Sequence, residues 1–379
     1  MLIGIRDMAK LFAISVVCCC AVFVCALFMN YNIDIGAVKD EITTPMGMVI
    51  YDAVVATGKV VVGVSGGCLA ATTVVLLIFY VKNYIDSHGK ELGILKALGY
   101  SDMRVAGHFW VFGISVFIGT GVGYAGAMGY MPNFYEAQNG EGLFPDIDPE
   151  FHLGLAFCMI VLPTVFFMLL SVFYAFFKLK SPVLGLLKES RNVKIKKGKF
   201  DDKDLPFLSD LKRNTLKSRK SLVFFVGFSA FCFSAMTQMS MSMNELASDT
   251  FSWMIISIGL ILAFMTLLMS LTSVVKGNGK TIAMMKVFGY SRRECSGSVL
   301  DGYRPVTYIG FIIGTAYQYF LLKIMVDIVF ADYEDMPDYS FDFKALAISL
   351  VTFIAAYEII LYIFGRKLDR QSVKSIMLE

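Results

Sequence analysis

The sequence predicts an all-α polytopic membrane protein. Apolar residues make up 56% of its 379 residues and charged residues only 17%, whereas a water-soluble chain carries nearer a quarter charged residues. Eight apolar segments are each long enough to cross a bilayer as a helix, which takes about 20 residues. A short motif also occurs twice, each time between two of these segments. We therefore predict eight transmembrane helices arranged as two repeats.

The eight predicted spans are uniformly apolar, and only the last contains an Asp, Glu, Lys or Arg. They run in order at Leu11–Met29, Val60–Val81, Val105–Tyr130, Leu153–Phe177, Ser221–Ser242, Phe251–Val275, Pro305–Leu322 and Ala345–Gly365. We expect the first to be a membrane span and not a cleaved signal peptide, because its apolar run of 19 residues exceeds a usual signal core.

The charged residue in the last span is Glu358, which we predict to be an intramembrane polar site. A carboxyl group at that depth is costly unless it is paired, solvated or protonated. Two interpretations remain open. Glu358 is either hydrogen bonded inside the bundle, with Gln318 or a tyrosine as its partner, or a polar point in a substrate path.

Basic residues predict which side of the membrane each connection occupies. The stretch Lys178–Lys220 holds 14 basic and 5 acidic residues, and the segments Lys82–Arg104 and Lys276–Arg304 add 4 and 6 basic residues. The remaining connections together hold 16 acidic residues, with Lys39 and Lys59 as their only cations. We therefore expect both termini, both motif copies and the central linker to be cytoplasmic.

The chain divides into two halves, residues 1–188 and 205–379, joined by a polar linker at 189–204. Four spans in each half make this a parallel repeat, whereas many secondary transporters have inverted repeats. The outer loops are short, the longest having 29 residues. We therefore expect no large extracytoplasmic domain.

The repeated motif is GKELGILKALGYS at Gly89–Ser101 and GKTIAMMKVFGYS at Gly279–Ser291, with six of thirteen positions identical. Apolar residues at helical spacing predict a short amphipathic helix that a glycine ends. We expect it to dock on a cytoplasmic partner; the alternative is a helix lying on lipid headgroups. The predicted docking residues are Lys90, Glu91, Leu92, Leu95, Lys96, Leu98 and Gly99, and Lys280, Ile282, Met285, Lys286, Phe288 and Gly289.

The third span of each half carries a glycine pair with three residues between, Gly119 and Gly123 in the first half and Gly310 and Gly314 in the second. Such pairs allow two helix backbones to approach closely in lipid. We therefore predict that these glycines pack against a neighbouring helix, with a hinge as the alternative.

The sequence offers no sign of catalysis in this chain. Gly279-Lys280-Thr281 lacks the earlier glycine of a phosphate-binding loop, because position 274 is Val. The three histidines, at 88, 108 and 152, do not have the spacing of metal ligands and have no nucleophile partner. We expect no catalytic residue, no metal site and no cofactor in this chain, and no nucleic-acid partner.

The motif in its context resembles the signature of FtsX-type permeases, the MacB-like or type VII class of ABC transporter membrane subunits. The resemblance rests on KELGILKALGYSDMRV at Lys90–Val105, on the basic lead-in DLKRNTLKSRKSLVFFVGFSA at Asp210–Ala230, and on the ending SPVLGLLKES at Ser181–Ser190. It implies that each motif copy is a coupling helix, which docks on a separate ATPase. Two four-span units form the usual assembly, so this chain resembles a fused dimer.

The resemblance implies a multi-pass subunit of the bacterial cytoplasmic membrane that works with two ABC ATPase subunits, which bind ATP and Mg. It implies export or extraction of an amphipathic peptide or lipid-like substrate. Two alternatives remain open: a mechanotransmission complex that drives an extracellular partner, and an ATP-independent secondary transporter. Identical or different ATPases, with or without a small accessory subunit, are all compatible with the sequence.

Overall fold

The structure is a computed structural model that describes residues 12–42, 45–139, 147–180, 211–213, 216–217, 220–242, 249–291, 294, 297, 301–329 and 341–370. The chain divides into two compact units. The first comprises Met1–Arg191 with the short segments Ser248–Phe251 and Ile324–Asp338, and the second comprises the remainder. The main boundary, between Arg191 and Asn192, falls within the predicted linker.

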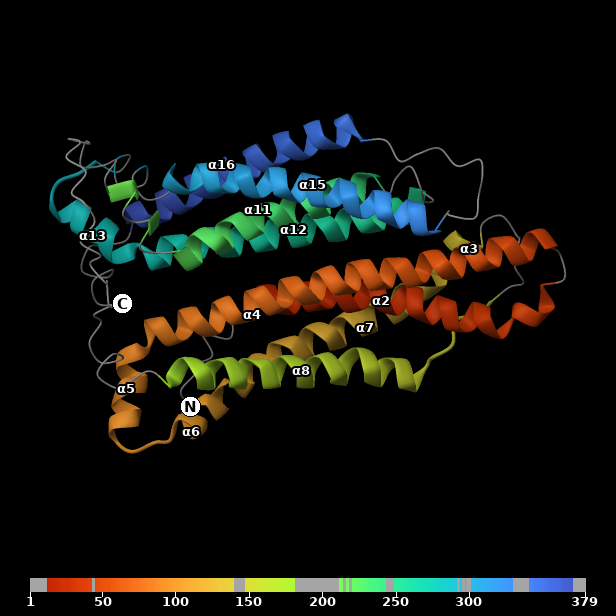
Figure 1. Ribbon diagram of the computed structural model, residues 1–379, viewed down its shortest axis with the longest axis horizontal. Coiled ribbons are helices and arrows are strands. Elements are labelled where there is room, and N and C mark those ends of the chain that lie inside the picture. The colour runs from red at the N-terminus through yellow and green to blue at the C-terminus, as the bar shows by residue number, and fades with distance from the viewer. Residues whose placement is uncertain are drawn as a thin grey trace. The chain divides into compact units, whose positions relative to one another are not determined.

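The described part of the chain is built from helices and contains no strand (Figure 1). In the first half the elements are α2 (Phe12–Ala37), η2 (Lys39–Glu41), α3 (Pro45–Val61), the π-helix η3 (Val62–Gly66), α4 (Gly67–Ser87), α5 (Gly89–Ala97), α6 (Asp102–Gly107), η4 (His108–Trp110), α7 (Val111–Gln138) and α8 (Leu153–Leu179). In the second half they are α11 (Lys220–Ser242), α12 (Asp249–Gly277), α13 (Gly279–Val287), η6 (Asp301–Tyr303), α15 (Arg304–Val329) and α16 (Phe343–Arg370).

Seven helices within the described residues are long and apolar enough to cross a membrane. They are Phe12–Ala37, Leu69–Ser87, Asp102–Gln138, Leu153–Leu179, Lys220–Met239, Ser257–Val275 and Phe343–Ile363. The prediction of an all-α polytopic membrane protein is confirmed. The eighth predicted span, Pro305–Leu322, lies in the 26-residue helix α15, which is not among the seven.

The connection between the first two spans is more helical than the sequence analysis assumed. Helix α2 continues to Ala37, and α3 begins at Pro45 and runs through the π-helix into α4. The prediction of an outer loop over 31–59 is therefore wrong for most of its length. A π-helical turn widens the helix by one residue and is frequent at functional positions.

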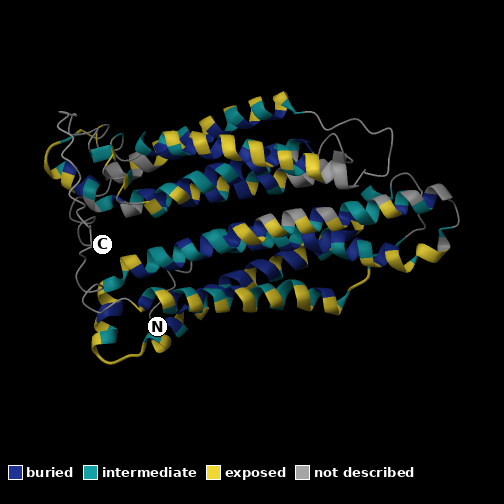
Figure 2. Ribbon diagram, in the orientation of Figure 1, coloured by how far each residue is buried: buried dark blue, intermediate teal, exposed yellow. Residues whose placement is uncertain are grey.

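Helix α2 occupies the centre of the first unit, whereas α8 lies at its periphery. Several α2 side chains are fully buried, including Ile14, Val17 and Leu27. The exposed positions of α8 are instead large and apolar, among them Phe157 and Phe173 (Figure 2). Such a face is stable against lipid, since the hydrocarbon core of a bilayer is as apolar as these side chains.

Both glycine pairs lie where the third long helix of a half crosses the first. A Cβ added at Gly119 or Gly123 of α7 would overlap the backbone of α2, at Ser15 and Cys19 respectively. In the second half, a Cβ at Gly310 or Gly314 of α15 would overlap the backbone of α11 at Gly227 and Phe231. The same device therefore brings the two backbones together in each half.

Hydrogen bonds between helices add to this packing in the second half. The Ser229 hydroxyl donates to Ser270 of α12 at 2.8 Å. Gln238 of α11 donates to the Thr315 hydroxyl of α15, also at 2.8 Å. Buried polar groups of this kind are satisfied between helices because the bilayer core offers no water.

Candidate functional site

The two motif copies form short helices, α5 and α13, that follow directly on α4 and α12. A single residue separates the helices in each copy, His88 with φ −105° and ψ 23°, and Asn278 with φ −107° and ψ 8°. His88 Nδ1 lies 3.1 Å from the Tyr84 carbonyl oxygen, and Asn278 Nδ2 donates to the Val274 carbonyl at 2.9 Å. Both turns therefore place the short helix across the end of the long one (Figure 1).

The identical Gly-Tyr of each copy ends the short helix. Gly99 (φ 92°) and Gly289 (φ 83°) are the only residues of the described chain with positive φ. The Gly99 N–H donates to the Lys96 carbonyl at 3.0 Å and the Tyr100 N–H to the Leu95 carbonyl at 3.2 Å. The second copy has the same pair of bonds. This is the Schellman arrangement, in which glycine adopts a left-handed conformation that other residues disfavour.

The serine that completes the motif begins the next segment. The Ser101 hydroxyl accepts a hydrogen bond from the Arg104 N–H at 3.3 Å, so Ser101 is the N-cap of α6. Ser291 accepts one from the Glu294 N–H at 3.4 Å, while the Glu294 carboxylate accepts from the Ser291 N–H at 2.8 Å. The second copy therefore forms a capping box. Gly-Tyr-Ser has a structural reason to be the same in both copies.

The predicted docking residues divide between an inward and an outward face. Leu92 in α5, and Ile282 and Met285 in α13, are buried in the chain itself. In α13 the two buried residues pack against Leu211, Val275 and Tyr290. These side chains hold the short helix onto its own unit, and they are not on the surface that a partner would meet.

The outward face is apolar in both copies. Leu98 is 71% exposed and Phe288 is 77% exposed, as predicted docking residues would be. Ile94 in α5, and Met284 and Val287 in α13, are also exposed but were not among the predicted residues. A helical wheel around Leu98 and Phe288 would have found them, since positions three or four residues apart share a face.

Lys96 links α5 to two other elements. Its ammonium group lies 2.8 Å from the Asp102 carboxylate at the start of α6 and donates to the Leu179 carbonyl at the end of α8. The side chain is only 10% exposed, so this is an internal contact. Lys90 and Glu91 are exposed, and Lys286 is half-buried. The side chain of Lys280 lies outside the described part of the structure.

Glu358 is paired with Arg304, at the start of α15. The Arg304 Nη2 atom lies 3.0 and 3.1 Å from the two carboxylate oxygens of Glu358. The predicted partner Gln318 is wrong, because Gln318 donates instead to the Ser242 hydroxyl at 3.5 Å. The corresponding residues of the first half, Gly113 and Met168, pack directly on each other. An ion pair in one half thus replaces an apolar contact in the other.

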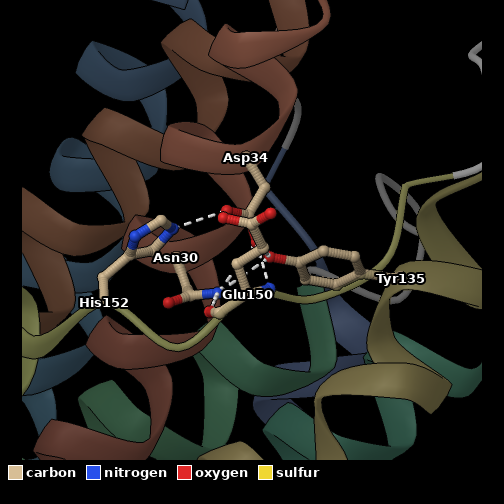
Figure 3. Close-up of polar contacts among 5 residues, drawn as sticks. All are labelled: Asn30, Asp34, Tyr135, Glu150 and His152. Carbon is tan, nitrogen blue, oxygen red and sulfur yellow. Dashed lines mark hydrogen bonds and ion pairs between the residues drawn. The ribbon is translucent and has the colours of Figure 1, made fainter.

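A second polar site lies at the end of the first unit opposite α5, and the sequence analysis missed it (Figure 3). Asp34 is buried, with its side chain 4% exposed. Its Oδ2 atom accepts hydrogen bonds from the Tyr135 hydroxyl, the Asn30 amide at 3.0 Å and the Glu150 N–H at 3.2 Å. Its Oδ1 atom pairs with His152 Nε2. The network joins α2, α7 and the segment before α8.

The spacing of Asn30 and Asp34 could have indicated this site. Residues four apart lie on one face of a helix, so a first span extended past Met29 would have placed both side chains together. Within the described residues, no group of three or more His, Cys, Asp or Glu is arranged to hold a metal ion. The network is therefore a set of hydrogen bonds that joins three segments.

The fold and the motif geometry define a duplicated helical membrane protein, in which each half presents a short helix between its second and third long helices. The model of the family "FtsX-like permease C-terminal" matches residues 63–180 and 253–373, and the chain belongs to this family. The two matches begin 190 positions apart, as do the two motif copies. Neither curated proteins nor solved structures gave a significant match.

Membership in this family carries a general role. FtsX-like permeases are typically non-catalytic membrane subunits, and they generally work with ABC ATPase partners at the membrane. The protein is accordingly a multi-pass membrane permease. Each family match includes one of the two short helices.

Proposed function

We propose that this chain is the permease subunit of a MacB-like, type VII ABC transporter and that α5 and α13 are its coupling helices. One observation carries the proposal. Two copies of a short helix, each fixed by the same turn and the same glycine end, expose apolar residues while their inner residues are buried. An exposed apolar face on a rigidly held helix fits a protein partner better than water.

The contacts within the first unit suggest how a movement of α5 reaches the opposite end. Lys96 joins α5 to the last residue of α8. The segment before α8 is joined to α2 through His152 and Asp34. Helix α8 has 27 residues and is therefore about 40 Å long at 1.5 Å per residue. A displacement of α5 by an ATPase would in this way move both ends of α8.

One chain would bind two ABC ATPase subunits, and these partners would hold the ATP and Mg; this chain would need no cofactor and no metal. The basic central linker and motif segments support a location in the bacterial cytoplasmic membrane with both termini cytoplasmic. The apolar face of α8 supports an amphipathic peptide or lipid-like substrate, exported or extracted from the membrane. A small accessory subunit remains compatible with this assembly.

The test is substitution on the exposed faces alone. Leu98→Glu and Phe288→Glu place a charge on the proposed contact without disturbing a buried residue. The double variant should lose its copurifying ATPase and its ATP-dependent transport, whereas Leu98→Met with Phe288→Met should keep both. An ATPase that remains bound to the double Glu variant would contradict the proposal.

The helical extension of the first unit favours one alternative. Helices α2 and α3 continue past the predicted spans, to Ala37 and from Pro45. A continuous helix transmits motion lengthwise, as a mechanotransmission complex with an extracellular partner would require. Cross-linking from Asp52 or Lys59, both exposed on α3, would distinguish the two functions. Capture of a defined outer protein, whose activity requires ATP, would favour mechanotransmission.

A further inference from the structure

The two short helices present unequal outward faces. Their exposed apolar residues at equivalent positions are Ile94, Ala97 and Leu98 in α5, and Met284, Val287 and Phe288 in α13. The α13 side chain is the larger in two of the three pairs, Val against Ala and Phe against Leu. Because apolar area removed from water drives association, α13 has the greater capacity for contact with a partner.

The charges of the two motif segments differ in the same direction. Residues 89–104 carry three basic and two acidic residues, a net charge of +1, and residues 279–294 carry four basic and one acidic residue, a net charge of +3. Exposed Glu91 corresponds to Thr281, and Asp102 corresponds to Arg292. In the first segment the Lys96 charge is also neutralised by Asp102 within the chain. The second segment is thus the more cationic as well as the more apolar.

We propose that α13 is the principal anchor for one ATPase subunit and that α5 makes a weaker, more readily released contact with the other. The inference rests on the proposed function. The partner surface that receives α13 is an apolar pocket with acidic residues at its border, since it must accept Phe288 and a net positive segment. Attraction between opposite charges raises the association rate and falls as salt increases.

The two faces can be exchanged without touching a buried residue. Met284→Ile, Val287→Ala and Phe288→Leu give α13 the outward face of α5, and Ile94→Met, Ala97→Val and Leu98→Phe make the reverse change. All six positions are exposed, so the fold has no reason to change. Thermal unfolding of each triple variant checks this directly.

The probe is the ATPase that copurifies with the tagged full-length chain and is labelled by azido-ATP, subsequently produced alone. Its binding to the wild-type chain in nanodiscs should show two phases, one tight and one weak. The α13 triple variant should weaken the tight phase about tenfold. The α5 triple variant should strengthen the weak phase by a similar factor. The tight phase should also be the more salt-sensitive of the two.

Different failures have different meanings. If the two α13 and α5 triple variants change binding equally, or if wild-type binding has a single phase, the unequal anchoring is refuted while docking stands. If neither triple variant nor the double Glu variant changes binding, the coupling-helix assignment itself fails. If α5 proves the tighter site, the inference is reversed and therefore wrong.

Discussion

The glycine pairs at the two helix crossings predict a sharp response to the smallest substitution. A Cβ added at Gly119 would lie 2.9 Å from the Ser15 Cα, and one at Gly123 would lie 3.0 Å from the Cys19 Cα. Carbon atoms prefer a separation of about 3.5–4.0 Å. Helices α2 and α7 would therefore have to separate by about 0.5–1 Å along their contact. Overpacking of this size costs about 1–3 kcal/mol.

The same helix supplies matched controls for this prediction. A Cβ at Gly121 or Gly129 would meet nothing within 4 Å. Alanine is also favoured over glycine inside a helix by about 1 kcal/mol. Gly121→Ala and Gly129→Ala should therefore leave stability unchanged or raise it. Gly119→Ala and Gly123→Ala share this gain but should still be destabilised.

Thermal unfolding in detergent, followed by the fluorescence of Trp110, measures the difference. A loss of 1 kcal/mol lowers the midpoint by about 2–4 °C in a unit of this size. The double variant Gly119→Ala with Gly123→Ala should fall furthest. Equal midpoints for this double variant and for Gly121→Ala would refute the close approach of α2 and α7. Gly314→Ala should act likewise in the second half, because its Cβ would lie 2.9 Å from the Ser234 Cβ.

Three further predictions concern polar contacts. Asp34→Asn removes an acceptor from a buried network, so it should cost about 1–3 kcal/mol and speed proteolysis at residues 139–152; unchanged cleavage would contradict the network. Lys96→Met should raise amide exchange in α5, whereas Lys90→Met should not, and equal exchange would show that Lys96 holds nothing. Hydrogen bonds from Ser291 hold the pKa of the Glu294 carboxyl below its usual value. The capping box is therefore stabilising above about pH 4.3, the value for unfolded Glu, and this contribution is lost as pH falls through the folded pKa. Amide protection at Glu294 should fall with acid in the wild type, and Glu294→Gln should show no such dependence.

Features set by the bilayer could be predicted from the sequence. The thickness of the hydrocarbon core requires long apolar helices, so composition alone indicated an all-α membrane protein. The repeat offset of 190 residues was evident from the motif, and the family match has the same offset. The helix ends at Gly99 and Gly289 were also predictable, because a left-handed residue after a helix favours glycine.

Features that depend on a neighbouring element could not be predicted. Met284 and Met285 are adjacent and chemically identical, yet one is exposed and the other buried. Only the contacts of α13 with Leu211, Val275 and Tyr290 decide between them.

The same limit applies to the polar pairs. Glu358 needed a partner because a lone carboxyl group in the membrane is costly, but the partner lies 54 residues away, at Arg304. Asp34 was assigned to a loop because its charge argued against a membrane span. The structure instead supplies it with donors that lie more than 100 residues away.

The sequence by itself determined the class of protein, the duplication and the places where the short helices begin and end, since local chemistry and the bilayer impose these. The tertiary structure alone decided which faces are outward and which charges are neutralised. Both depend on side chains brought together by packing between segments far apart in the chain.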